Sequence, residues 1–170
     1  SAASDVYKRQ AAYCGTDHEN VIVGNGSTEL ISLFIQIEHP KKAMIIGPTY
    51  YEYEREISLG GGTTLYYPLR EKDDFRLDVN DFISHLNENI DLLVICNPNN
   101  PTGTYVNSAK VEEFIRKLPD HVIPVVDEAY FEYVEDPTHY SLIKMIQEGY
   151  DRPLFVLRTF SKIYGMAGLR

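Results

Sequence analysis

The apolar run at residues 91–96, Asp-Leu-Leu-Val-Ile-Cys, constrains the fold of this chain more than any other segment. After its first residue it carries no charged side chain, so a strand formed here must be buried on both faces. Comparable apolar runs end at Ile46, Val126 and Leu157, and segments with helical periodicity separate them. Buried strands that alternate with helices are typical of a parallel sheet with helices on both faces. We therefore predict an α/β fold with a doubly wound, mostly parallel sheet.

The same patterns predict the individual elements. We expect strands at residues 21–23, 43–46, 64–67, 91–96, 122–126 and 154–157. We expect helices at residues 27–38, 51–57, 79–86, 110–118 and 141–147, with Asp78 as the N-cap of the third helix and Gly60-Gly-Gly62 as the stop of the second.

Composition and charge exclude several classes of protein. The chain has 170 residues, of which 44% are hydrophobic, and this is enough for a sizeable core. Its net charge of -9, with no basic stripe, argues against a nucleic-acid or membrane partner. Cys14 and Cys96 have no metal-ligand spacing and the histidines are scattered, so we expect no disulfide framework and no metal site. We expect a cytoplasmic protein.

Ligands of parallel sheets bind beyond the carboxyl ends of the strands, so the loops there are the candidate sites. The first loop, Gly24-Asn-Gly-Ser-Thr-Glu29, opens a helix, and Ser27 and Thr28 there are suited to bind a phosphate. A plain helix cap is the alternative. The loop is not a dinucleotide motif, because Glu29 stands at the third glycine position, and it lacks the lysine of a P-loop. After the next strand, Tyr50 could stack on a flat ring or simply pack in the core.

Two further loops carry polar groups at strand ends. Asn97-Pro-Asn-Asn-Pro-Thr-Gly103 predicts a rigid turn, from which the Asn100 amide could donate to a phenolate oxygen. Asp127 ends an apolar strand and is followed by Glu128-Ala-Tyr130. Asp127 could hold a ring nitrogen protonated, with Tyr130 sharing the phenolate oxygen. The alternatives for Asp127 are a cap, a salt bridge or, less favoured, metal ligation together with Glu128.

The last loop, Arg158-Thr-Phe-Ser-Lys162 and onward to Arg170, contains an amine among anion-binding groups. Lys162 could form an imine with an aldehyde cofactor. Thr159, Ser161 and Arg170 offer two hydroxyls and a guanidinium to a phosphate. A solvated surface lysine is the alternative.

Together these strings resemble the fold type I enzymes that use pyridoxal 5′-phosphate, and most closely the histidinol-phosphate aminotransferase branch and the related threonine-phosphate decarboxylases. The resemblance runs from about Glu19 to Arg170. It implies that Lys162 carries the cofactor and moves the substrate proton, that Asp127 pairs with the pyridine nitrogen, and that Tyr130 assists catalysis. It further implies that the cofactor is bound by Ser27, Thr28, Tyr50, Asn100, Asp127, Tyr130, Thr159, Ser161, Lys162 and Arg170.

By resemblance, the expected activity is transfer of an amino group between a phosphorylated amino substrate and 2-oxoglutarate, by a homodimer. The segments 159–162 and 165–170 favour an aminotransferase, whereas residues 69–75 and 19–26 match decarboxylases about as well. A non-catalytic binding or regulatory protein on the same fold is the alternative from another class.

The resemblance also predicts how the chain is divided. Residues 19–170 correspond to part of the large cofactor-binding domain, without the N-terminal arm and the small C-terminal domain of the family. Residues 1–18 form a separate N-terminal segment with little pattern, and whether all of it is native stays open. We expect this stretch alone to be inactive and poorly soluble, because a sheet edge and a core face would be uncovered.

Overall fold

A five-stranded parallel sheet forms the centre of the protein. The computed structural model describes residues 2–86 and 89–168, with side chains from residue 5 onward. The strand order is β2-β1-β3-β4-β5, and every neighbouring pair is parallel. The strands are β1 (Lys42–Gly47), β2 (Thr63–Pro68), β3 (Leu92–Cys96), β4 (Ile123–Asp127) and β5 (Phe155–Leu157). The predicted parallel sheet is confirmed.

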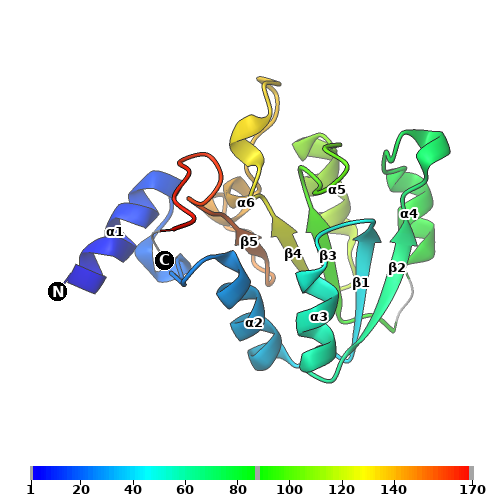
Figure 1. The fold of residues 1–170 in the computed structure, drawn as a ribbon, viewed down its shortest axis with the longest axis horizontal. Helices are drawn as coiled ribbons and strands as arrows, with labels where there is room; N and C mark the ends of the chain where they lie inside the picture. The colour runs from blue at the N-terminus through cyan, green and yellow to red at the C-terminus, as the bar shows by residue number, and fades with distance from the viewer. Residues whose placement is uncertain (1, 87–88, 169–170) are drawn as a thin grey trace.

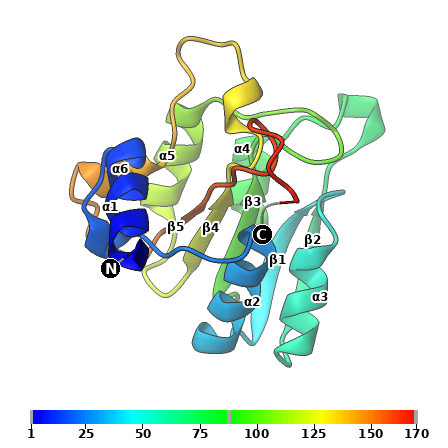
Figure 2. The same cartoon turned by 60° about the vertical axis from the view of Figure 1, so that its left-hand side comes forward.

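Helices cover both faces of this sheet (Figures 1 and 2). Their bounds are α1 (Ala2–Cys14), α2 (Ser27–Glu38), α3 (Glu52–Leu59), α4 (Val79–His85), α5 (Ser108–Lys117) and α6 (Ile143–Gln147). Short 3-10 turns occur at His18–Asn20, Glu71–Asp73 and Phe131–Tyr133. The helices α2 and α3 pack on one face, while α4, α5 and α6 pack on the other.

Alternation along the strands explains why the apolar runs are continuous. In β3, Leu92 and Val94 belong to the core under α2 and α3, whereas Leu93 and Ile95 belong to the core under α4 and α5. Successive strand residues point to opposite faces, so each face of β3 requires its own apolar set. All five residues of β3 are buried, as a central strand covered on both sides requires.

The register brings the carboxyl ends of the strands to one edge. Cys96 pairs with Asp127, and Asp127 pairs with Leu157, so the last residues of β3, β4 and β5 lie side by side. The loops that leave them therefore start at the same edge of the sheet, as expected for a doubly wound fold.

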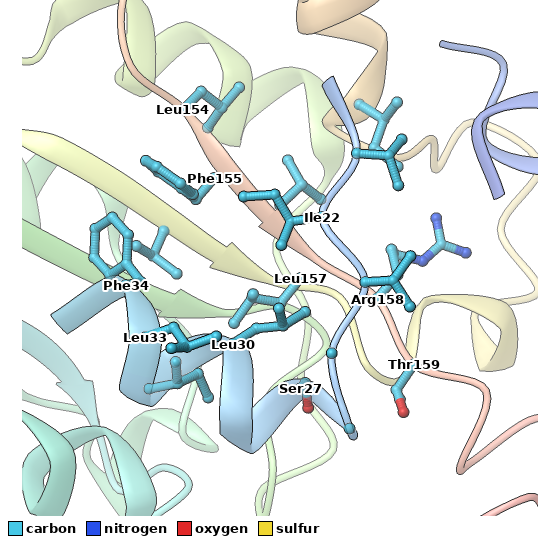
Figure 3. A pocket seen from close by; sticks show the side chains of 18 of the residues that line it. Ile22, Ser27, Leu30, Leu33, Phe34, Leu154, Phe155, Leu157, Arg158 and Thr159 are labelled. Carbon is cyan, nitrogen blue, oxygen red and sulfur yellow. The ribbon is translucent and has the colours of Figure 1, made fainter. Parts of the chain in front are cut away.

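The predicted strand at residues 21–23 is wrong. This segment precedes α2 without β structure, and Ile22 is 66% exposed. It runs past the free edge of β5, but a cavity of about 700 Å³ separates the two (Figure 3). A strand needs a hydrogen-bonded neighbour, and the cavity leaves this segment without one.

The sequence also gave no sign of the first helix. Residues 2–14 form α1, whose last carbonyl, that of Cys14, accepts a hydrogen bond from Gln147 Nε2 at the end of α6 (2.9 Å). The hydroxyl of Tyr13, near the end of α1, lies 3.0 Å from the hydroxyl of Tyr164, near the other end of the chain. Helix α1 thus packs beside the loop after β5, an arrangement visible in Figure 1.

Candidate active site

Two of the three asparagines in the turn after β3 form side-chain hydrogen bonds to other parts of the protein. Asn97 Oδ1 accepts the backbone N–H of Val106, and its Nδ2 donates to the carbonyl of the same residue. Asn99 Nδ2 donates to the carbonyl of Pro48 and to Thr102 Oγ1, and its Oδ1 accepts from Thr49 Oγ1. These bonds fix the turn against the loop after β1.

Asn100 is the third asparagine of the turn, and its side chain does not take part in fixing it. Within residues 2–86 and 89–168 its side-chain amide has no hydrogen-bond partner, and Asn100 lines a second cavity of about 630 Å³ together with Tyr130. The predicted phenolate-binding pair, Asn100 and Tyr130, therefore shares one cavity wall. Asn97 and Asn99 therefore fix the predicted turn, while Asn100 in the same loop is the amide that faces a cavity.

Asp127 is the most deeply buried of the predicted site residues that the structure describes, at 3% exposed. Its Oδ1 accepts the backbone N–H of Ala129 at 2.9 Å, and its Oδ2 accepts the hydroxyl of Tyr53 at 2.5 Å. Burial raises the pKa of Asp127, while the Tyr53 hydroxyl, the Ala129 N–H and the charge of Lys162 oppose that rise. A carboxylate held this way is suited to a positively charged partner that would complete its solvation.

Lys162 lies in the exposed loop after β5, close to both predicted partners. Its Nζ is 5.3 Å from the centre of the Tyr130 ring, and its charge lowers the pKa of Asp127. Lys162 itself is exposed. The amine therefore lies beside the phenol, on the solvent side, and its charge acts on the buried acid.

Tyr50 reaches the site through a second tyrosine. Its ring meets the ring of Tyr53 edge-on, with the centroids 5.6 Å apart, and Tyr53 is bonded to Asp127. Tyr50 is half-buried, so part of its ring surface is open to a ligand. The sequence analysis gave no role to Tyr53. Its position three residues after Tyr50, at the start of α3, was the available signal.

The start of α2 has the form expected of an anion site. Its N-cap is Gly26, at φ 81° and ψ 162°, and no side chain caps the first turn. The Ser or Thr cap considered above is therefore not present, and backbone N–H groups of that turn are left for a ligand. Ser27 lines the first cavity, whereas Thr28 is half-buried on the same turn and is not among the residues that line it.

Ser27 shares that cavity with the loop after β5. Thr159 and Ser161 line it too, and Thr159 Oγ1 accepts the backbone N–H of Ser161 at 3.1 Å. Figure 3 shows Ser27 and Thr159 at one end of the cavity, with the apolar side chains of Leu33, Phe34 and Phe155 further along it. The hydroxyls of both predicted phosphate segments thus gather at one end. Arg170, the predicted guanidinium, lies outside the described residues.

A buried ion pair that the sequence analysis did not predict connects two of these loops. Glu128 is 2% exposed; it accepts the hydroxyl of Ser141 (2.6 Å) and the backbone N–H of Leu142 (2.7 Å). Arg158 Nη1 lies 3.5 Å from Glu128 Oε2. Burial raises the pKa of Glu128 to about 7, against the opposing effect of these donors and of the Arg158 charge.

Arg158 also holds the segment that follows Tyr130. Its Nη2 is 2.5 Å from Glu132 Oε1, and its guanidinium lies over the ring of Phe131, 4.5 Å from the centroid. Arg158 therefore connects the start of the lysine loop to the segment after β4. Its place directly before Thr159 was the only signal in the sequence.

The structure offers no support for metal ligation by Asp127 and Glu128. Over residues 2–86 and 89–168, no group of three or more His, Cys, Asp or Glu side chains is placed to hold a metal ion. In the same part of the chain, none of the helices has the length and apolar character needed to cross a membrane.

Comparison with known proteins identifies the family. The model of the family "Aminotransferase class I and II" matches residues 2–170. The chain belongs to this family. The match begins well before Glu19, where the resemblance was first apparent, and so includes α1.

Relatives of this aminotransferase-family chain include two kinds of enzyme. Histidinol-phosphate aminotransferase 2 of Carboxydothermus hydrogenoformans is 39% identical over 167 residues, which cover 94% of this chain and 44% of that protein. A protein of Caldanaerobacter subterraneus subsp. tengcongensis, provisionally named as a threonine-phosphate decarboxylase, is 40% identical over 161 residues, or 94% of this chain and 43% of that protein.

Solved structures of the family confirm the fold. Histidinol-phosphate aminotransferase from Sinorhizobium meliloti, in complex with pyridoxal-5′-phosphate, superposes with a TM-score of 0.84 at 28% identity. The superposition covers 98% of this chain and 45% of that one. The chain therefore spans less than half the length of the relatives it matches.

Proposed function

We propose that the full-length protein is a pyridoxal-phosphate-dependent aminotransferase of the histidinol-phosphate aminotransferase type. Its substrates would be a phosphorylated amino compound and a keto acid such as 2-oxoglutarate. The proposal is supported above all by the positions of Asp127 at the end of β4, Tyr130 just after it, and Lys162 in the loop after β5, with Lys162 Nζ 5.3 Å from the centre of the Tyr130 ring and its charge acting on Asp127.

The donor set fits this cofactor. Asp127 is a buried carboxylate in need of a cationic partner, which a protonated pyridine nitrogen provides. Asn100 and Tyr130 share a cavity wall and could both bind the oxygen next to the aldehyde. The uncapped start of α2, with the hydroxyls of Ser27 and Thr159, is suited to a phosphate dianion. We assign the same anion site to Thr28, Ser161 and Arg170, and the ring face to Tyr50.

The roles of the residues follow from where they lie. When bound, the cofactor would supply an electron sink for charge that develops at the substrate's α-carbon. Asp127, which is almost completely closed to solvent, would keep the cofactor in its protonated form. Lys162 Nζ would anchor the cofactor and move the proton at the α-carbon, because its exposed loop brings it to the open side. Tyr130 lies next to that amine and would orient it toward the proton that leaves the α-carbon.

A covalent label tests the assignment of Lys162. The full-length protein, incubated with pyridoxal phosphate, reduced with borohydride and digested, should carry the added mass on the peptide that contains Lys162. The matched control is Lys144, a half-buried lysine on α6 that pairs with Glu148. Labelling of Lys162 and Lys144 to the same low extent, or no label, would contradict the proposed function and favour a non-catalytic binding protein.

Decarboxylation of a phosphorylated amino acid is the second candidate. It is favoured by the 40% identity to the Caldanaerobacter protein. The two reactions share the cofactor and differ in which bond to the α-carbon breaks, so one assay separates them. Glutamate-dependent formation of a keto product indicates the aminotransferase, while release of carbon dioxide from threonine phosphate without a keto acceptor indicates the decarboxylase.

We further propose that the full-length protein is a cytoplasmic homodimer. The dimer is inferred from the family resemblance, and the location is supported by two unpaired cysteines, Cys14 and Cys96, which suit a reducing compartment. Light scattering on the full-length protein measures the mass directly; a monomer would contradict the dimer.

A further inference from the structure

Among the described residues, Tyr53 forms the shortest hydrogen bond to the carboxylate of Asp127, the predicted partner of the ring nitrogen. It lies in the first turn of α3, is 1% exposed, and donates its hydroxyl to Asp127 Oδ2 at 2.5 Å. Asp127 Oδ1 is bound separately, by the backbone N–H of Ala129. Each carboxylate oxygen therefore has one donor from the protein, and the lone pairs that remain determine where a ligand can bind.

The direction of this hydrogen bond is fixed. Burial raises the pKa of Tyr53 well above its usual value, and the charge of Asp127 raises it further. Tyr53 therefore stays protonated and remains a donor. A hydroxyl that donates to a buried carboxylate favours the ionised form of that carboxylate, and the Tyr53 hydroxyl does lower the pKa of Asp127 against the effect of burial.

The ring of Tyr53 has a second contact in the site. It meets the Tyr50 ring edge-on, at an interplanar angle of 85°. Tyr53 thus contacts the residue proposed to stack on the cofactor through its ring, and the residue proposed to bind the cofactor's nitrogen through its hydroxyl.

We propose that Tyr53 is a positioning residue, which orients the Asp127 carboxylate toward the ring nitrogen of the cofactor and supports Tyr50 at the cofactor's face. This rests on the proposed function, because it presumes that Asp127 binds that nitrogen. Tyr53 would not touch the substrate or the cofactor itself.

The variant Tyr53→Phe removes only the hydroxyl, so its ring can still pack against Tyr50. In the full-length protein, we expect the dissociation constant of pyridoxal phosphate to rise about tenfold or more, the size of effect typical of losing a hydrogen bond to a charged group. We also expect kcat to fall more than the KM for the amino donor changes. The pH at which the absorbance of the bound cofactor changes should shift, a result that a purely structural role would not produce.

Tyr67→Phe is the matched control. Tyr67 is also buried, at 7% exposed, and its hydroxyl donates to the carboxylate of Asp81 at 2.5 Å, on the opposite face of the sheet from Tyr53. Both variants lose one tyrosine–carboxylate hydrogen bond, but Tyr67→Phe should leave cofactor binding and its absorbance titration unchanged. If the two variants behave alike in cofactor affinity and absorbance, Tyr53 has no positioning role.

A second background tests whether Tyr53 acts through the charge of Asp127, and thermal melts first check that Tyr53→Phe and Tyr67→Phe are equally folded. In Asp127→Asn there is no charge for Tyr53 to stabilise, so adding Tyr53→Phe should change cofactor affinity by less than about twofold. A further tenfold loss in the double variant would overturn the proposal. If wild type binds the cofactor and Tyr53→Phe binds it equally well, only the role of Tyr53 fails. If wild type binds none, the proposed function fails with it.

Discussion

The end of β4 and the loop after β5 supply the two groups on which the proposed chemistry depends, and these two regions are built in opposite ways. Asp127 ends a buried strand and has both carboxylate oxygens bonded to the protein. Lys162 lies in a loop whose residues 162–168 are all exposed. The hydrogen bonds of that loop are few: Ser161 to Thr159, Gly165 to Lys162, and Tyr164 to Tyr13.

The difference fits the role proposed for each group. An acid that pairs with a fixed ring nitrogen gains from a rigid, dry setting, because oriented groups cost no reorganisation during the reaction. An amine that anchors a cofactor and then moves a proton must change partners, and a loop with few contacts permits this. The acid is therefore part of the folded core, while the amine is not. This contrast predicts that variants at the two positions separate activity from stability.

The largest effect is expected for Lys162→Ala. In the full-length protein turnover should fall about 10³-fold or more, because the proton-moving amine is lost. The free energy of unfolding should change by less than about 0.5 kcal/mol, because the side chain is exposed. Steady-state kinetics and denaturant unfolding check the two parts. Cofactor binding should remain, but weaker, and a variant that retains normal turnover would contradict the role of Lys162.

Asp127→Ala should damage activity almost as much, and stability as well. We expect turnover to fall about 10²- to 10³-fold, because the electrostatic support of the ring nitrogen is lost. Unlike Lys162→Ala, this variant leaves the buried Tyr53 hydroxyl without its acceptor, which should cost about 1–3 kcal/mol of unfolding free energy. Near-normal activity would show that Asp127 does not bind the ring nitrogen.

Glu128→Gln should flatten the dependence of stability on pH. The pKa of Glu128 is raised from 4.5 to about 7 in the folded state, so the folded protein holds this proton more tightly than the unfolded chain. The stability that results is fully present below about pH 4.5 and is lost as the pH rises through about 7, a change of about 3 kcal/mol. Unfolding free energies of the full-length protein at several pH values should show this slope in wild type and not in the variant. An equal slope in both would place the pH dependence elsewhere.

The smallest effects should separate two neighbouring asparagines. Asn99→Ala removes bonds to Pro48, Thr49 and Thr102 and should lower the unfolding free energy by about 1–3 kcal/mol. Asn100→Ala should change stability by less than about 0.5 kcal/mol, but weaken cofactor binding several-fold. Thermal melts and cofactor titrations of both variants test the assignment, and a reversed pattern would contradict it.

Much of the fold could be predicted from the sequence, because its signals are local. The buried run that became β3 and the apolar face that became α2 each specify one element through their periodicity. The failure at residues 21–23 has the opposite cause. Three apolar residues form a strand only if a neighbouring strand pairs with them. Whether such a neighbour is present depends on distant parts of the chain and cannot be predicted from the segment itself.

The candidate site likewise contains residues that the sequence predicts and residues that it does not. Asp127 and Lys162 were predicted as site residues because Asp127 ends one apolar run and Lys162 lies in the loop after another, where a parallel sheet places its ligands. Asn100 was predicted to face a ligand, but the role of Asn99 in fixing the turn could not be predicted, because it depends on hydrogen bonds to residues about 50 positions away. Tyr53 and Arg158 were missed for a related reason. Their partners are 74 and 30 positions distant, and only the folded chain brings them together.

The contact of Tyr13 with Tyr164 joins residues 151 positions apart, and it bears on how the protein is handled in the laboratory. The ring of Phe160 lies beside both tyrosines, so helix α1 forms part of the support for the loop that carries Lys162. Substitutions in α1 that remove the Tyr13 ring would therefore reach the loop of Lys162 through two aromatic contacts. Variants of α1 should be compared for cofactor content before their activities are compared.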